Sequence, residues 1–227
     1  MEFSVVWDNL PKLLQGAQLT LEITLLSLMI GLVIAVPVAL MRRSKNPLLW
    51  MPAYGYILYF RGTPLLIQLF LIYYGSGQFR PELSDLGLWG LFREAYFCGV
   101  LALTLNTGAY TAEIFRGAIQ AVPAGDVEAA KACGMGRILI FRRIILPKAI
   151  RLAWPMYGNE VVFLMQATSL VSVITLLDLT GIAGRIISKT FAVYEIYIMT
   201  ALLYLAITYA IVFLFKRIEK RLNRHLA

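Results

Sequence analysis

Long apolar runs constrain this chain more than any other feature of its sequence. The clearest run extends from Leu19 to Leu40 and contains a single charged residue, Glu22. About 20 apolar residues in an α-helix are enough to cross the hydrocarbon core of a bilayer. Further apolar runs occupy about residues 48–75, 95–115, 152–177 and 193–215. We therefore predict an all-α membrane protein in which residues 1–227 form a single domain of five transmembrane helices.

The distribution of basic residues predicts how these helices are oriented. The chain has 21 Lys and Arg residues, most of them between the apolar runs. With the N-terminus outside, 15 of them fall on the inner side and five on the outer side. Because Lys and Arg accumulate in cytoplasmic loops, we expect the N-terminus out, the C-terminus in and residues 116–151 in the cytoplasm. We expect the residues before Leu19 to form an interfacial segment carrying Trp7.

The second apolar run is interrupted by Arg61-Gly62-Thr63-Pro64. A proline inside a helix removes one backbone hydrogen bond, so we predict a kink here, in the middle of the span. Such breaks occur at moving gates and at binding sites. Arg61 has two interpretations: it contacts a carboxylate of the solute, or it binds helix carbonyls that the break frees.

The cytoplasmic segment contains the stretch VEAAKACGMGRILIFRRIILP. Asp126, just before it, stands where an N-cap would accept backbone N–H bonds, and Glu128 would lie in the first turn. Gly134 suits a left-handed helix end, and Pro147 is expected to break a second helical piece, residues 137–145. These signals predict two short helices across the cytoplasmic ends of the spans. On composition alone, a basic segment resting on anionic lipid fits equally well.

The spacing within this stretch is more specific than its composition. Glu128-Ala129-Ala130, Gly134, Ile144 and Leu146-Pro147 match the fixed positions of the EAA loop of permease subunits in bacterial ABC importers, a family that this chain resembles. Four other stretches are similar to the permeases of polar amino acids: Phe60 to Leu66, Leu103 to Gly117, Gly158 to Val161 and Ala167 to Leu170. The resemblance therefore covers nearly the whole chain.

This resemblance implies the type I importer permease fold, also called MetI-like, in a bacterial inner membrane. It implies a second homologous permease subunit, two ATP-binding cassette subunits and an extracytoplasmic amino-acid-binding protein as partners. ATP and Mg²⁺ would be bound by the cassette subunits, and this chain contains no GxxxxGK[ST] nucleotide-binding loop. The resemblance also implies that one set of residues couples ATP hydrolysis to transport: Glu128, Ala129, Ala130, Gly134, Ile144, Leu146 and Pro147.

Glu22, Glu113 and Glu160 lie within the predicted spans, where a charge needs a partner or a function. We expect Glu22, near the outer end of its span, to be hydrogen-bonded or to snorkel toward water. We expect Glu113 to form an ion pair with Arg116, three residues later on the same helix. Glu160 differs, because it stands about 12 Å inside its span with no basic residue nearby in sequence.

Two interpretations of Glu160 and its polar neighbours remain open. The polar stripe can pack against a partner permease and be satisfied by interhelical hydrogen bonds. Alternatively, Glu160 faces the translocation path and attracts an ammonium or guanidinium group of the solute, which we favour because intramembrane acids are commonly functional. The residues that we expect along this path are Glu160, Asn159, Gln166, Thr168, Ser169, Arg61 and Thr63.

If Glu160 contacts the solute, a basic amino acid is the expected substrate. Gly62 to Leu66 and Tyr73 to Phe79 are most similar to permeases of arginine and of the histidine/lysine/arginine/ornithine group, and opine permeases are close relatives. A secondary transporter or a channel-like protein for small polar solutes is the alternative function, although secondary transporters usually carry internal repeats. A non-transporting scaffold would leave Glu160 unexplained.

Other classes of function are disfavoured. Nucleic-acid binding requires a basic face on a soluble fold, whereas these basic residues flank apolar runs in contact with membrane lipid. The two cysteines and the single histidine, His225, form no metal-ligand pattern. No nucleophile–base pair can be assembled either, so we expect a transport subunit rather than an enzyme.

Overall fold

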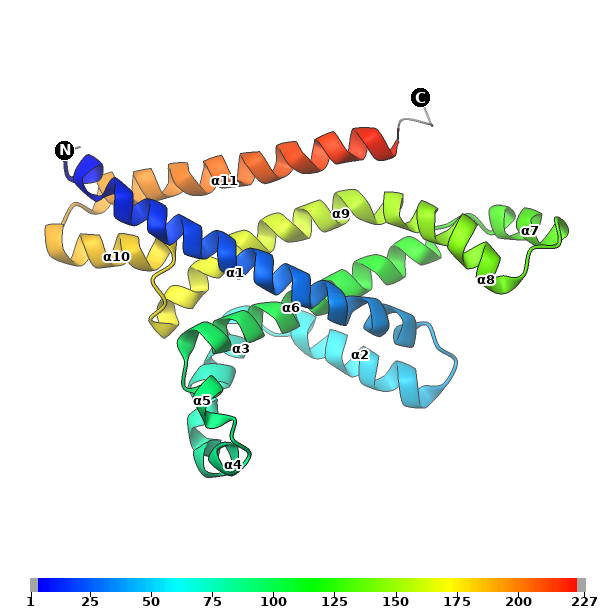
Figure 1. Ribbon diagram of the computed structural model, residues 1–227, viewed down its shortest axis with the longest axis horizontal. Coiled ribbons are helices and arrows are strands. Elements are labelled where there is room, and N and C mark those ends of the chain that lie inside the picture. The colour runs from blue at the N-terminus through cyan, green and yellow to red at the C-terminus, as the bar shows by residue number, and fades with distance from the viewer. Residues whose placement is uncertain (1–3, 224–227) are drawn as a thin grey trace.

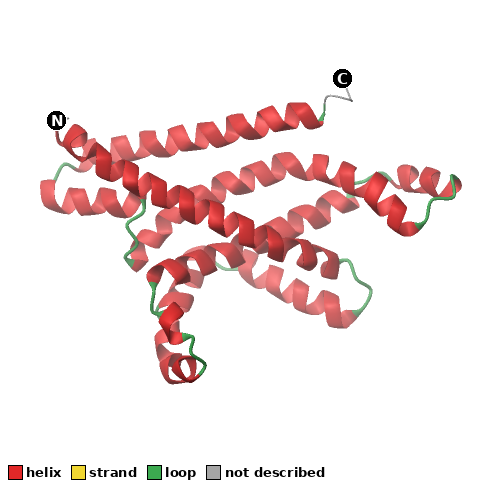
Figure 2. Cartoon of the chain, viewed as in Figure 1, coloured by secondary structure: helices red, strands yellow, loops and turns green. Residues whose placement is uncertain are grey.

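The computed structural model describes residues 4–223, and every regular element within that range is helical (Figures 1 and 2). Arg224 and His225, which the sequence argument used, lie outside this range. The α-helices are α1 (Ser4–Arg42), α2 (Pro47–Gly62), α3 (Leu65–Tyr73), α4 (Arg80–Asp85), α5 (Trp89–Phe92), α6 (Ala95–Gln120), α7 (Ala124–Ala132), α8 (Arg137–Ile140), α9 (Leu146–Ala167), α10 (Leu179–Thr190) and α11 (Val193–Leu222). Two 3₁₀ segments, η1 (Gly75–Phe79) and η3 (Thr168–Ile174), and a π-helical turn, η2 (Phe141–Ile145), complete the described chain.

The helices form an elongated bundle with α1 and α6 crossing at its centre (Figure 1). One core cluster joins α1, α3, α6 and α9 through Ile23, Leu69, Leu103 and Leu164. A second cluster packs the start of α1 onto α10 and α11. In Figure 1, α7 and α8 lie at one end of the bundle, and α10 and the start of α1 lie at the other. The predicted cytoplasmic segment is thus far from the predicted outer end.

The first helix differs from the prediction. We expected a separate interfacial segment before Leu19, but α1 is continuous over 39 residues. Its early turns are held by tertiary packing, because Leu13 is fully buried and Gly16 lies against α10. A Cβ at Gly16 would be 2.8 Å from the Cα of Leu179, so only glycine permits this close approach. That packing extends the helix beyond the apolar run.

The predicted break in the second apolar run is confirmed, and it is sharper than a kink. Helix α2 ends at Gly62, and the helical segment that starts at Leu65 leaves it at 106°. The polar stretch that follows folds into η1, α4 and α5, which project from the side of the bundle (Figure 1).

Helix α10 was not predicted. It begins at Asp178, whose fully buried carboxylate accepts hydrogen bonds from the backbone N–H of Gly181 at 2.9 Å and of Thr180 at 3.2 Å. An aspartate that accepts bonds from the N2 and N3 amides is the standard N-cap arrangement. This cap orders the segment between the fourth and fifth apolar runs, which the sequence argument treated only as an outer loop.

The number of membrane spans remains a prediction. Helices α1 and α11 are each long and apolar enough to cross a bilayer, and two bent helix pairs raise the number to as many as four. Helix α6 is not among them although it has 26 residues, because it carries several polar side chains that face the protein interior: Thr104, Asn106, Thr107 and Thr111. The count of five and the orientation of the termini stay predictions.

Candidate functional site

The break between α2 and α3 is stabilised by a cluster of polar side chains, which we call the hinge cluster: Thr63, Gln68 and Asn106. Pro64 has no N–H, so the carbonyl of Phe60 loses the hydrogen bond that an unbroken helix would supply. Two side-chain amides replace it, from Gln68 Nε2 at 2.9 Å and Asn106 Nδ2 at 3.1 Å. Gln68 Nε2 also lies 3.0 Å from the carbonyl of Thr63, and Asn106 donates to Gln68 Oε1 at 3.0 Å.

Glu160 lies beside this cluster in the fold. The residue is 9% exposed, and its Oε1 accepts a hydrogen bond from the hydroxyl of Thr107 on α6 at 2.9 Å. Thr107 directly follows Asn106, so α6 links the hinge cluster to Glu160. The other oxygen, Oε2, makes no hydrogen bond within residues 4–223. The carboxylate is therefore held by one interhelical bond and retains capacity for another donor.

The other predicted pathway residues on α9 and η3 fall into two groups, one exposed and one bonded to nearby backbone. Asn159 and Gln166 are exposed on α9. Thr168 is buried and its hydroxyl donates to the carbonyl of Met165, while Ser169 donates to the carbonyl of Gln166. The last two hydroxyls therefore bind their own helix.

Arg61 is exposed and does not bind the carbonyls freed at the break. Its guanidinium lies over the ring of Tyr110, 5.2 Å from the centroid. It lines a cleft of about 240 Å³ together with Arg42, Tyr54 and Glu113. The carbonyl-binding role is filled by Gln68 and Asn106, which the sequence argument missed.

The predicted coupling segment contains the short helices α7 and α8, but the expected start of α7 was wrong. Helix α7 starts at Ala124 after Pro123, and no side chain caps it. Asp126 is therefore inside the first turn rather than at the N-cap, and it forms an ion pair with Lys148 at 2.6 Å. Glu128 consequently lies beyond the first turn.

Gly134 ends α7 as predicted. Its φ is +76°, and the N–H of Met135 bonds to the carbonyl of Ala130 at 3.1 Å. This six-to-one bond after a left-handed residue is the Schellman motif. It turns the chain sharply between α7 and α8.

Pro147 does not break the helix, contrary to the prediction. The chain continues from α8 through η2 into α9, and the N–H of Leu146 bonds to the carbonyl of Phe141, five residues earlier. Proline fits in the first turn of α9, where its missing N–H is tolerated. The π-helical turn thus connects the predicted cytoplasmic segment to α9 without an interruption.

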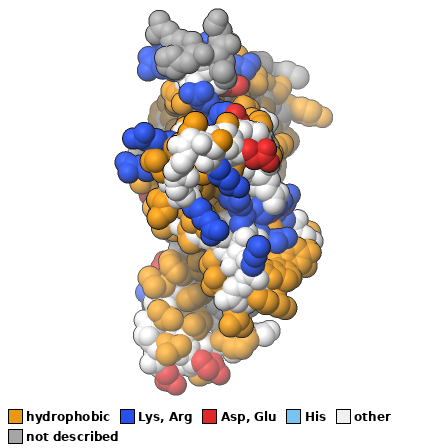
Figure 3. Space-filling model, turned by 90° about the vertical axis from the view of Figure 1, so that its right-hand side faces the viewer, with side chains coloured by type: hydrophobic (Ala, Val, Ile, Leu, Met, Phe, Trp, Pro, Cys, Tyr) orange, Lys and Arg blue, Asp and Glu red, His pale blue; other side chains and the backbone are white. Residues whose placement is uncertain are grey.

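The coupling segment presents side chains that lack partners within the described chain. Glu128 and Ala129 are exposed, and Ala130 is buried. Ile138 on α8 is 85% exposed and lies outside the predicted spans. Figure 3 looks onto this end and shows Lys and Arg side chains gathered across it. An apolar tip rimmed by charge is typical of a surface that contacts another protein.

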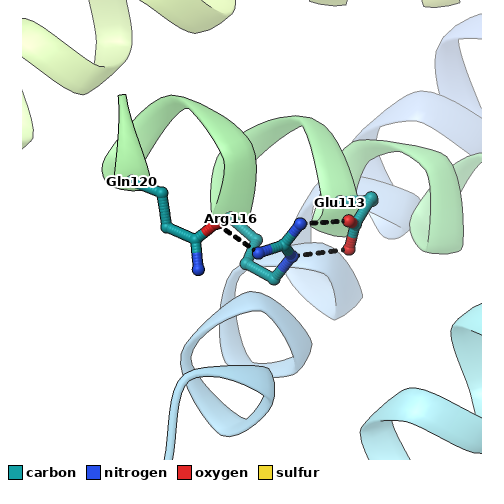
Figure 4. A network of polar contacts seen from close by, with 3 residues as sticks. All are labelled: Glu113, Arg116 and Gln120. Carbon is teal, nitrogen blue, oxygen red and sulfur yellow. Dashed lines mark hydrogen bonds and ion pairs between the residues drawn. The ribbon is translucent and has the colours of Figure 1, made fainter. Parts of the chain in front are cut away.

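Glu113 and Arg116 form the predicted ion pair near the C-terminal end of α6. Arg116 Nε donates to Glu113 Oε2 at 2.8 Å, and the same guanidinium contacts Gln120 (Figure 4). The predicted hydrogen bond of Glu22 is also confirmed, with Tyr96 as its donor at 2.7 Å. Both acids therefore have structural partners, and Glu160 is the buried one among the acids of the predicted spans.

Comparison with known proteins decides the family. The sequence pattern of the family described as "Binding-protein-dependent transport system inner membrane component" matches residues 27–224. This chain belongs to that family. It is a permease subunit of the ABC importer type in an inner membrane, as the sequence argument predicted. Permease subunits of this family work with ATPase subunits and binding proteins and carry no catalytic site themselves.

Several permeases are similar along nearly their whole length. The nopaline transport system permease protein NocM of Agrobacterium fabrum is 51% identical, covering 100% of this chain and 94% of NocM. The octopine permease OccM of Rhizobium meliloti is 49% identical, covering 94% and 87%. The histidine/lysine/arginine/ornithine permease HisM of Escherichia coli is 42% identical, covering 92% and 88%.

Solved structures confirm the fold of this permease. A chain of an amino acid ABC transporter crystallised with histidines superposes with a TM-score of 0.88 at 37% identity, covering 97% of this chain and 99% of that one. A chain of the inward-facing MetNI methionine ABC transporter gives a TM-score of 0.75 at 21% identity, covering 95% and 98%. The MetI-like fold is therefore established.

Proposed function

We propose that this permease moves a cationic amino acid, or an opine built on one, into the cytoplasm by alternating access. The named substrates of NocM, OccM and HisM support this class. The observation that carries the proposal is the Glu160 carboxylate, which is nearly buried, lies among membrane helices and has one oxygen without a hydrogen bond in the described chain. A cationic ammonium or guanidinium group is the ligand that such a carboxylate would hold most strongly.

We propose that the break between α2 and α3, which the hinge cluster stabilises, moves during transport. Helices with freed backbone groups recur at gates and substrate sites of transporters. Asn106 bonds to Gln68 of the hinge cluster, and the next residue, Thr107, bonds to Glu160. A movement of the break would therefore also shift the hydrogen bond of Glu160. We propose Asn159, Gln166 and Arg61 as exposed groups along the path, with Thr63, Thr168 and Ser169 shaping its walls.

We also propose that α7 and α8 dock an ATPase subunit, which holds ATP and Mg²⁺. The exposed Glu128 and Ile138 support this, because neither has a partner within the described chain. The complex would contain two such ATPases, a second homologous permease and an extracytoplasmic binding protein. Closure of the ATPases would then push on α8, which is continuous with α9.

The substrate proposal is tested by uptake into cells that carry the complete transporter. Glu160→Gln keeps the size of the side chain and removes its charge, so uptake of arginine or nopaline should fall at least tenfold, equivalent to about 1.4 kcal/mol. Glu22→Gln is the matched control, since that acid is exposed and bonded to Tyr96. Wild-type uptake by the Glu160 variant, with normal assembly, would refute the proposed role.

The coupling proposal needs a separate readout. Glu128→Lys or Gly134→Pro should uncouple ATP hydrolysis from uptake, or release the ATPase from the membrane. Glu219→Lys on α11 makes the same charge change elsewhere on the inner side and should preserve coupling. Uptake that follows the proton gradient rather than ATP would instead identify a secondary transporter.

A further inference from the structure

A cleft of about 490 Å³ lies between the start of α1 and α10, at the end of the bundle opposite the coupling segment. Three basic side chains line it: Lys12 from α1, and Arg185 and Lys189 from successive turns of α10. Asn9 and Thr190 add polar groups, and Ile182 and Ile186 form an apolar floor. The proposed transport mechanism uses none of these residues.

Among residues 4–223, no acidic side chain lines this cleft. The ion pairs within residues 4–223 include none of its three cations, and Lys12 donates only to the neutral side chain of Asn9, at 2.8 Å. Asp178 at the start of α10 is fully buried and occupied by backbone amides and Tyr204. The cleft therefore carries three positive charges that no acidic side chain of the described residues neutralises.

The cleft lies at the level expected for lipid headgroups. Thirty residues of α1 separate Arg42 from Lys12, which is about 45 Å of helix. This distance is close to the thickness of a bilayer with its headgroups, about 40–45 Å. Trp7 and Tyr194, near the same end, are 69% and 73% exposed, and aromatic residues of this kind are enriched at membrane interfaces.

We propose that this cleft binds the phosphate group of an anionic phospholipid of the outer leaflet. The guanidinium of Arg185 and the ammonium groups of Lys12 and Lys189 surround the phosphate, and Ile182 and Ile186 contact the apolar part next to the headgroup. A lipid held here bridges α1 and α10, next to the apolar cluster that already packs the two helices together. The site therefore stabilises the outer end of the permease.

The test uses the complete transporter in nanodiscs of phosphatidylcholine with a minor fraction of dioleoylphosphatidylglycerol. Each basic residue near a membrane surface contributes about fivefold to the attraction of an anionic lipid, so Arg185→Gln/Lys189→Gln should reduce retained phosphatidylglycerol by roughly 25-fold. Lipid retained after detergent washing is measured by mass spectrometry. Arg80→Gln/Arg93→Gln removes the same charge from the loop before α6 and should retain the lipid, as should Lys189→Arg.

Four results would overturn the proposal. Unchanged retention in the cleft variant would show that no lipid binds there, and equal loss in both double variants would indicate general surface charge. Displacement of the lipid by millimolar inorganic phosphate would assign the cleft to free anions. Weaker capture of the binding protein with unchanged lipid retention would assign it to protein docking.

Discussion

Replacement of Gln68 by leucine should destabilise the permease, because leucine removes both polar groups of a buried side chain and puts an apolar group in their place. Gln68 is 1% exposed and is the sole hydrogen-bond donor to the carbonyl of Thr63 within the described chain. Gln68→Leu leaves that carbonyl unpaired and removes the acceptor of one N–H of Asn106. Each buried group left unpaired costs about 1–3 kcal/mol, but hydrogen bonds measured inside membranes average about 0.6 kcal/mol. We therefore expect a loss of about 2 kcal/mol in the free energy of unfolding.

The measurement is reversible unfolding in mixed micelles, combined with a double-mutant cycle. Gln68→Leu and Asn106→Leu share one hydrogen bond, so their effects should be non-additive by about 0.5–2 kcal/mol. Gln78→Leu makes the same chemical change at an exposed position of η1 and should alter stability by less than about 0.5 kcal/mol. Equal stability of Gln68→Leu and the wild type would refute the argument that these amides hold the break together.

Three further changes test other contacts. Gly31→Ala should destabilise by about 1–3 kcal/mol in thermal unfolding, because its Cβ would lie 2.7 Å from a methyl of Thr107, whereas Gly55→Ala, in open space, should not. Asp178→Ala removes an N-cap, so α10 should exchange its amide hydrogens faster, with a loss of about 1–2 kcal/mol; unchanged exchange would contradict the cap. Tyr96→Phe should change stability by less than about 1 kcal/mol, because the carboxylate it binds is exposed, and a larger loss would indicate a buried bond.

Features that depend on neighbouring residues could be predicted from the sequence. The left-handed glycine at Gly134 and the break at Pro64 follow from local backbone chemistry, and both are present. The ion pair of Glu113 and Arg116 follows from helical spacing in the same way. Helix α10 was missed although Asp178 offers an N-cap signal, because the segment is short and its Arg185 and Lys189 were used only to predict orientation.

Features that depend on distant residues could not be predicted. Asp126 has the chemistry of an N-cap, but it pairs with Lys148, 22 positions away, after Pro123 has already started the helix. The hydrogen bond between Gln68 and Asn106 spans 38 positions. Nothing in the local sequence of either residue indicates that it replaces a bond lost at Pro64. The local sequence of Glu160 likewise gives no indication of its partner Thr107, which is 53 positions away.

The uninterrupted path from α8 through η2 into α9 makes this part of the chain a lever. Sixteen residues separate Ile144, near the predicted cytoplasmic end, from Glu160, which corresponds to about 24 Å of helix. A tilt of about 10° pivoting near Ile144 would move Glu160 by about 4 Å at that helical rise. A displacement of this size away from Thr107 would break the 2.9 Å hydrogen bond between Thr107 and Glu160.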